Sequence, residues 1–273
     1  LGAFTALFAA VIACTQRDIK RILAYSTLSQ LGYMMFSLGV VKSVHGADVN
    51  AIGYTASMFH VFTHAFFKCL LFLAAGAAIH AVHSNLLDHM GGLRRKLPWT
   101  YASVLVACLA IAGIFPFAGF FSKDEILLAA WLGGHKVIFG VGLLTGGLTA
   151  FYMFRFFFLI FHGAPRGHAE HAHEDPLMTV PIVLLAIPSA VAGWAFKDVF
   201  TAHVVLGSAA HGHGVAHPHW LPWLAGLVGA AGIAVAWLVY ASRRADVAKA
   251  LRDENRPRWY RIAQNKFYID EAW

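Results

Sequence analysis

Long apolar runs separated by short polar connectors make up most of this chain. Most of them approach the roughly 20 residues that an α-helix needs to cross the hydrocarbon core of a bilayer. Hydropathy places seven runs, at residues 1–15, 22–41, 52–82, 99–131, 137–162, 177–197 and 220–242. The pattern therefore predicts an all-α fold, a polytopic membrane helix bundle with about seven transmembrane segments.

The fourth run, 99–131, is too long for one straight crossing. A helix of that length would measure about 50 Å, against a hydrocarbon core of about 30 Å. Gly113, Pro116 and Gly119 lie near its middle, and these residue types remove a backbone donor or permit non-helical dihedral angles. Transporters tolerate such a break where the unwound backbone lines a buried cavity. We expect one broken helix here.

The distribution of Lys and Arg over the connectors supports a single crossing by this run. The connectors with odd numbers, counted from the N-terminus, and the C-terminal tail hold most of the basic residues: Arg17, Lys20, Arg21, Arg94, Arg95, Lys96, Arg166, Arg243, Arg244, Lys249 and Arg252. The even connectors hold Lys42, Lys136 and Lys197. The positive-inside rule places the odd connectors and the tail in the cytoplasm. If 99–131 crossed the membrane twice, the tail would lie on the opposite side of the membrane from the other basic clusters.

Composition agrees with an integral membrane protein. Hydrophobic residues make up 59% of the chain and charged residues only 13%, and the mean hydropathy is +0.61. The net charge of +7 resides in connectors and tail, so nucleic-acid binding is not supported. Cys14, Cys69 and Cys108 lie in apolar runs without a CxxC pair, which indicates neither a disulfide framework nor a thiolate metal site.

Both ends of the chain lack the signals of a natural start or stop. The run 1–15 is shorter than a full span and begins with Leu1. At the other end, 267–273 stops without a capping or turn signal. We therefore expect a fragment truncated at its N-terminus, with a transmembrane domain at 1–242 and a basic cytoplasmic tail at 243–273.

The third run carries the strongest candidate chemistry. His60, His64 and Lys68 recur every four residues, so on a helix they form one polar stripe about 12 Å long. A charge at the bilayer centre costs on the order of 2.5–3.5 kcal/mol, so it normally serves a purpose, and movement of protons or ions is the obvious one. The alternative is that the histidines only bond neighbouring helices and that Lys68 snorkels to the surface. Its position near the middle of the run argues against snorkelling.

Lys123 follows the expected break and precedes Asp124 and Glu125. It is either a second functional lysine or part of an ordinary exposed loop. Arg155 lies about two turns from the cytoplasmic end of its run, so snorkelling explains it without a functional role.

A weaker stripe of small and polar residues lies on the second run: Ser26, Ser29, Gln30, Tyr33 and Ser37. Such residues either let helices pack closely or line a water path.

Two connectors, beginning at His162 and His203, are rich in histidine. Such tracts can bind metal, but their spacing matches no closed site, and we interpret them as solvated loops without a metal site. No GxGxxG, Walker A, HExxH or nucleophile-elbow motif occurs, so nothing indicates a nucleotide site or a hydrolase.

Four stretches of this sequence resemble one known family when they are taken in order. They are QRDIKRILAYSTLSQLGYM, FHVFTHAFFKCLLFLAAG, MGGLRRKLP and AGFFSKDEIL. They are similar to the antiporter-like membrane subunits of NADH-quinone oxidoreductase (respiratory complex I), the subunit L family in particular. The wider family includes Mrp-type cation/proton antiporters and membrane-bound hydrogenases. The resemblance covers runs two to four densely.

The resemblance implies a proton relay of buried lysines and histidines. Lys68 resembles the central lysine on a continuous helix, His60 and His64 resemble the histidines that link it along the membrane, and Lys123 resembles the lysine at the broken helix. The family's earlier repeat, with its own lysine and glutamate, is absent from this chain, as are its lateral helix and last membrane helix.

The expected function is therefore that of a proton-translocating subunit of NADH-quinone oxidoreductase in the bacterial inner membrane. This chain would hold no cofactor, because NADH, FMN, the iron-sulfur clusters and quinone would bind to partner subunits. Two alternatives stay open: the large subunit of an Mrp-type Na⁺/H⁺ antiporter, and a purely structural membrane anchor, which would not explain Lys68 or Lys123.

Overall fold

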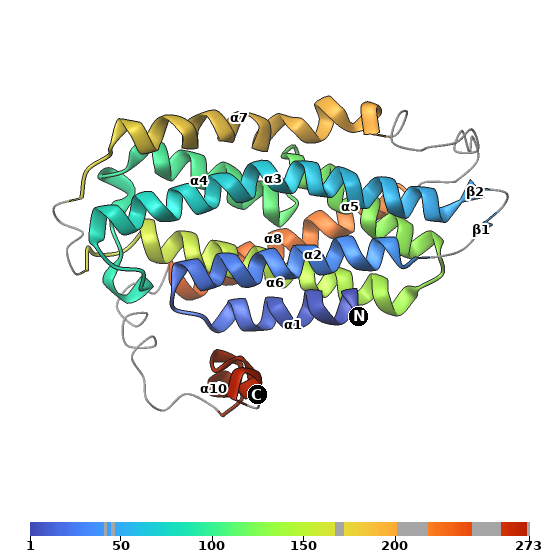
Figure 1. The fold of residues 1–273 in the computed structure, drawn as a ribbon, viewed down its shortest axis with the longest axis horizontal. Helices are drawn as coiled ribbons and strands as arrows, with labels where there is room; N and C mark the ends of the chain where they lie inside the picture. The colour runs from blue at the N-terminus through green and yellow to red at the C-terminus, as the bar shows by residue number, and fades with distance from the viewer. Residues whose placement is uncertain (41–42, 45–46, 167–171, 201–217, 242–257, 272–273) are drawn as a thin grey trace.

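A bundle of long helices that run along one common direction forms the fold (Figure 1). The computed structural model describes residues 1–40, 43–44, 47–166, 172–200, 218–241 and 258–271. The bundle contains α1 (Gly2–Thr15), α2 (Ile19–Leu38), α3 (Val49–Val82), α4 (Pro98–Ala112), α5 (Ala118–Leu132), α6 (Lys136–Phe161), α7 (Pro176–Val199) and α8 (Trp220–Tyr240). Each of the seven predicted segments coincides with one of these helices or, for the fourth, with two, so the predicted fold class is confirmed.

Short elements complete the described chain. Two antiparallel strands, β1 (Ser43–Val44) and β2 (Ala47–Asp48), precede α3 in the register Ser43↔Asp48 and Val44↔Ala47, and the sequence pattern did not predict them. The 3₁₀ helices η1 (Leu87–His89) and η2 (Leu93–Arg95) lie between α3 and α4, and α10 (Arg258–Gln264) and η5 (Lys266–Glu271) follow α8.

Four helices contain an apolar stretch long enough to cross a bilayer by length and composition. These stretches are Ile52–Val82, Lys136–Phe161, Pro176–Val199 and Trp220–Tyr240. The helices α1 and α4 are apolar but shorter, and α4 continues through the break into α5. In α7 and α8, few residues of the apolar stretch are buried, and large side chains such as Leu184 and Trp237 are exposed. Such a surface suits contact with lipid.

The basic connectors meet at one end of the bundle, as the charge pattern predicted. Between the first and third connectors, the Ile19 amide donates to the Asn85 carbonyl (3.0 Å), and Arg17 pairs with Asp88 (2.6 Å). In the fifth connector the His162 carbonyl accepts from the Gly92 amide (3.2 Å).

The segment α10 joins the same end of the bundle. The Gln16 side chain donates to the Gln264 carbonyl (3.1 Å). At the opposite end, Gly133 lies directly against Val40. The chain therefore crosses once between Pro98 and Leu132.

The predicted break in the fourth segment is confirmed. The first half, α4, ends at Ala112, and Gly113 adopts a left-handed conformation (φ 75°) that favours glycine. Pro116 follows a cis peptide bond, and α5 begins at Ala118.

Glycines let neighbouring helices pack closely around the break. A Cβ atom on Gly119 would lie 1.9 Å from the Ala110 carbonyl oxygen, and one on Gly193 of α7 would lie 2.6 Å from Ala118. The two helix ends that flank the break are thus packed against protein, whereas Phe115 within the unwound stretch is exposed.

The expectation that Arg155 snorkels is wrong. Its side chain on α6 is fully buried, and Nη1 donates to the Gln16 carbonyl (2.8 Å) at the corner between α1 and α2. Its Nε and Nη2 atoms have no hydrogen-bond partner among the described residues. The helix α1 and the α1–α2 corner cover the end of α6, so the guanidinium cannot reach the membrane surface.

Candidate functional site

All three ionisable side chains of the stripe on α3 point into the bundle. His60 is 0%, His64 8% and Lys68 5% exposed. The Lys68 ammonium donates to the Leu23 carbonyl of α2 (2.9 Å) and lies 5.9 Å from the Phe72 ring centroid. A lysine held by a backbone carbonyl inside the bundle does not snorkel, so that alternative is excluded for Lys68.

His60 is bonded at both ring nitrogens, to two different helices. Its Nε2 lies 3.0 Å from the Gln30 Oε1 atom of α2, and its Nδ1 lies 2.9 Å from the Ser122 Oγ atom of α5. Ser122 also lies 2.8 Å from the Thr63 Oγ1 atom, one turn along α3 from His60. His60 therefore connects α2, α3 and α5.

His64 is the least constrained member of the stripe. Its ring lies 6.0 Å from the His60 ring and edge-on to Phe67 at 5.4 Å. Its Nε2 atom is buried without a hydrogen-bond partner among the described residues. The stripe is thus not one continuous hydrogen-bonded row along α3, because both His60 nitrogens face sideways.

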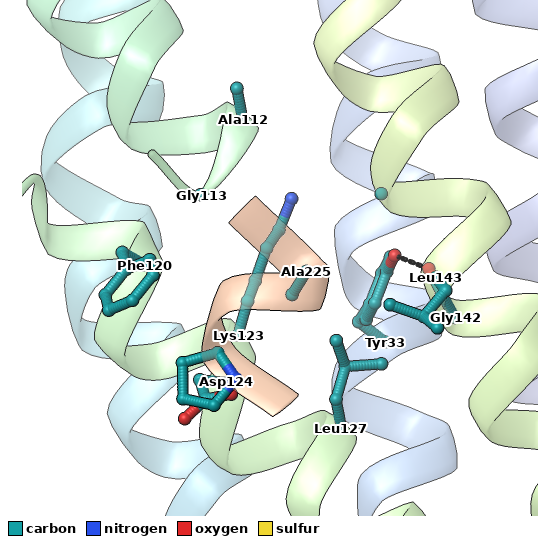
Figure 2. A pocket seen from close by; sticks show the side chains of 12 residues that line it. Tyr33, Ala112, Gly113, Phe120, Lys123, Asp124, Leu127, Gly142, Leu143 and Ala225 are labelled. Atoms are coloured by element: carbon teal, nitrogen blue, oxygen red, sulfur yellow. Dashed lines mark hydrogen bonds between the residues drawn. The ribbon is translucent and has the colours of Figure 1, made fainter. Parts of the chain in front are cut away.

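Lys123 on α5 reaches back to the end of α4. Its ammonium donates to the Ile111 carbonyl (2.5 Å) and lies 5.4 Å from the Tyr33 ring centroid. Figure 2 shows this side chain extending between Gly113 and Tyr33. The last carbonyls of a helix carry partial negative charge, so the end of α4 stabilises an ammonium there.

A small cavity lies beside Lys123. It measures ≈ 20 Å³, room for about one water molecule. Residues of α2, α4, α5, α6 and α8 line it, among them Tyr33, Lys123 and Asp124. A water here would have polar side chains on more than one helix as partners.

The alternative that the KDE stretch forms an ordinary exposed loop is excluded. Lys123 is buried within α5, and Glu125 forms an ion pair with Lys197 of α7 (3.0 Å). The Asp124 Oδ1 atom is buried without a hydrogen-bond partner in the described part of the chain. The break turns this stretch into the first turns of a packed helix half.

The polar stripe of the second segment divides between the two roles considered for it. Ser29 donates to the Ala6 carbonyl (2.8 Å) and Ser37 to the Gly53 carbonyl (2.8 Å), which joins neighbouring helices. Ser26 accepts from the Tyr152 hydroxyl (3.0 Å). Gln30 bonds His60, and Tyr33 lines the cavity beside Lys123.

Sequence reasoning missed Thr63 and Ser122 as neighbours of His60. The only sequence signal for Thr63 was its place one turn from His60. The only one for Ser122 was its place next to Lys123.

No group of three or more His, Cys, Asp or Glu side chains that could hold a metal ion occurs among the described residues. Much of the two histidine-rich connectors, including 167–171 and 201–217, lies outside those residues.

A family model described as "NADH:quinone oxidoreductase/Mrp antiporter, TM" matches residues 1–149, which include α1 to α5 and the four side chains His60, His64, Lys68 and Lys123. This chain belongs to that family. The match contains both the stripe on α3 and the broken helix, so the two features that sequence and structure single out lie inside the family region.

Two curated relatives match along the whole chain. The "NAD(P)H-quinone oxidoreductase chain 5" of Picosynechococcus sp. is 39% identical over 311 residues, which cover 100% of this chain and 45% of that protein. The "NADH-quinone oxidoreductase subunit L" of Rickettsia bellii is 39% identical over 298 residues and is covered to 43%. The chain thus spans less than half the length of these relatives.

A solved structure has the same fold. The Mrp complex from Dietzia sp. DQ12-45-1b contains a chain that matches this one with a TM-score of 0.67 and 24% identity, over 100% of this chain and 30% of that chain. Family membership and apolar helices together identify a multi-pass membrane protein.

Proposed function

We propose that this chain is part of a proton-translocating membrane subunit of NADH-quinone oxidoreductase, and that Lys68, His64, His60 and Lys123 move the protons. The observation that carries the proposal is the burial of two lysines, each bonded to a backbone carbonyl rather than to a carboxylate among the described residues. A buried charge without a counter-charge is costly. A lysine can end that cost by releasing its proton, whereas an arginine cannot.

The groups between the two lysines suit proton transfer. Histidine changes its charge near neutral pH and can both accept and donate a proton. His60 bonds Ser122, the residue before Lys123, and His64 stands between His60 and Lys68 on α3. A water in the cavity beside Lys123 could extend this route, since water bridges polar groups that are too far apart for direct contact.

We further propose that redox chemistry takes place in partner subunits and that the assembly resides in the bacterial inner membrane. NADH, FMN, the iron-sulfur clusters and quinone would bind to those partner subunits. Electron transfer in the partner subunits would drive the relay by moving the helices or the charges of this chain. The names of the relatives support this assignment. The family description also includes Mrp antiporters, so a sodium/proton antiporter subunit is the second candidate. The matching chain of the solved Mrp complex shares the fold of this chain at only 24% identity. Proton pumping driven by NADH oxidation separates the two candidates.

The decisive variants are Lys68→Ala and Lys68→Arg in the full-length subunit. Proton pumping and NADH oxidation are measured together in inverted membrane vesicles, after assembly of the complex has been checked. We expect Lys68→Ala to abolish most pumping while electron transfer to artificial acceptors continues. Lys68→Arg should fail too, because a guanidinium stays protonated at any relevant pH. Full pumping by Lys68→Arg would show that only the positive charge matters, and full pumping by Lys68→Ala would refute the proposed function.

A further inference from the structure

Three buried side chains with hydrogen-bonding groups surround His60. Gln30, Thr63 and Ser122 are all 0% exposed and come from three helices. They meet at one ring, with Gln30 at Nε2, Ser122 at Nδ1 and Thr63 at Ser122. A fully buried polar group normally needs a partner in every charge state it adopts, so the partners available here decide which states of His60 are possible.

The neutral state of His60 leaves neither of its ring nitrogens without a partner. The Gln30 Oε1 atom can only accept, so His60 carries its proton on Nε2 and offers Nδ1 as the acceptor. The Ser122 hydroxyl then donates to Nδ1 (2.9 Å), and the Thr63 hydroxyl donates to Ser122 (2.8 Å).

The protonated state is equally complete. An imidazolium donates from both nitrogens, so Nε2 keeps its bond to Gln30 and Nδ1 donates to Ser122. The Ser122 hydroxyl turns and donates to Thr63. The Thr63 hydroxyl donates to the His60 backbone carbonyl, which lies 3.3 Å away. Every hydroxyl and both ring nitrogens are satisfied in both states, with no movement of a helix.

We propose that Gln30, Ser122 and Thr63 form a hydrogen-bond switch that lets His60 take up and release a proton at Nδ1 while it stays fully buried. Gln30 is a positioning residue that fixes Nε2 as the permanent donor. Ser122 and Thr63 carry the exchanging proton. Nδ1 faces Ser122 of α5, the helix half that bears Lys123, so the exchange at Nδ1 runs through Ser122 and Thr63 and not by direct contact with the His64 ring. This inference rests on the proposed function.

Proton uptake then involves three transfers and no electrons. Nδ1 takes the Ser122 hydroxyl proton, and Ser122 takes the Thr63 hydroxyl proton. Thr63 takes the incoming proton from a protonated water molecule, which is left as neutral water, and turns that proton towards the His60 carbonyl. The net change is one proton added to His60. Release runs the same transfers backwards.

Thr63→Val is the sharpest test, because valine replaces the hydroxyl by a methyl group of nearly the same size. In the full-length subunit, in inverted membrane vesicles, we expect the ratio of protons pumped to NADH oxidised to fall on the order of tenfold or more. Thr63→Ser keeps the hydroxyl and should restore at least half of the wild-type ratio. Ser122→Ala and Gln30→Met should behave like Thr63→Val. Ser37→Ala is the matched control, since Ser37 is an equally buried hydroxyl whose partner among the described residues is the Gly53 carbonyl.

The outcomes separate this switch from the proposed function. If Thr63→Val pumps within twofold of the wild type while Lys68→Ala does not pump, the relay stands and the switch is wrong. If Thr63→Ser is as defective as Thr63→Val in assembled complexes, Thr63 acts by packing, which also overturns the switch. If Lys68→Ala pumps fully, the proposed function fails and the switch fails with it. Should Ser122→Ala prevent assembly, the comparison of Thr63→Val with Thr63→Ser still decides whether the switch operates.

Discussion

Substituting Gly119 by alanine tests whether the close packing of the broken helix positions Lys123. The new Cβ atom would lie 1.9 Å from the Ala110 carbonyl oxygen, whereas real Cβ atoms essentially never approach below 3.0 Å. The end of α4 and the start of α5 must therefore part by about 1.1 Å. Overpacking of this kind costs about 1–3 kcal/mol of stability.

The same displacement acts on the lysine. Ile111 follows Ala110 directly, and a shift of that size in the same direction lengthens its 2.5 Å bond from the Lys123 ammonium to about 3.6 Å, which is too long for a hydrogen bond. Lys123 would lose the carbonyl that stabilises its charge, so we expect Gly119→Ala to lower proton pumping several-fold.

The assay compares Gly119→Ala with Gly140→Ala in the full-length subunit. Gly140 lies on α6, and an added Cβ atom there would meet nothing within 4 Å, so this control should be neutral or gain about 0.5–1 kcal/mol. Proton pumping in vesicles and the melting temperature of the purified complex are measured for both. If Gly119→Ala pumps and melts like the wild type, close packing at the break does not position Lys123, and that reasoning is refuted.

Two further predictions concern orientation and a buried charge. Cysteines placed at Arg95 and Arg258 should both resist an impermeant thiol reagent added from outside the cell, and a cysteine at Lys136 should react. The reason is that the structure puts the first two positions at one end of the bundle and the third at the other. Labelling of the cysteines at 95 and 258 from opposite sides would contradict the single crossing. Arg155→Met should leave assembly intact and the melting temperature nearly unchanged. Loss of the bond to Gln16, about 1.5–3 kcal/mol, is offset by no longer burying a cation whose Nε and Nη2 atoms have no hydrogen-bond partner in the described part of the chain. A large drop in melting temperature would mean that the guanidinium is fully stabilised by its surroundings.

The sequence by itself determined the helices and the common end of the bundle at which the basic connectors lie. Backbone polar groups at membrane depth must be satisfied within the helix, so apolar runs of sufficient length have one stable structure. Glycine and proline at 113–119 could be interpreted as a break because they act on the backbone of their own segment. The basic clusters predicted a common end for their connectors, and direct bonds such as that of Arg17 with Asp88 confirm it.

Tertiary structure alone decided which side chains meet. Helix neighbours in a membrane are selected by close packing of small residues, such as Gly32 of α2 against Ala6 of α1, and no periodicity within one segment encodes that choice. Burial of Arg155 depends on the corner at Gln16 that covers it, so counting turns from the end of its helix gave the wrong answer. The periodicity of α3 placed His60 in line with His64 and Lys68, but the neighbours Gln30 and Ser122 turn its hydrogen bonds sideways. The direction in which His60 can exchange a proton is thus a property of three helices packed together, because a hydrogen bond needs both partners in place.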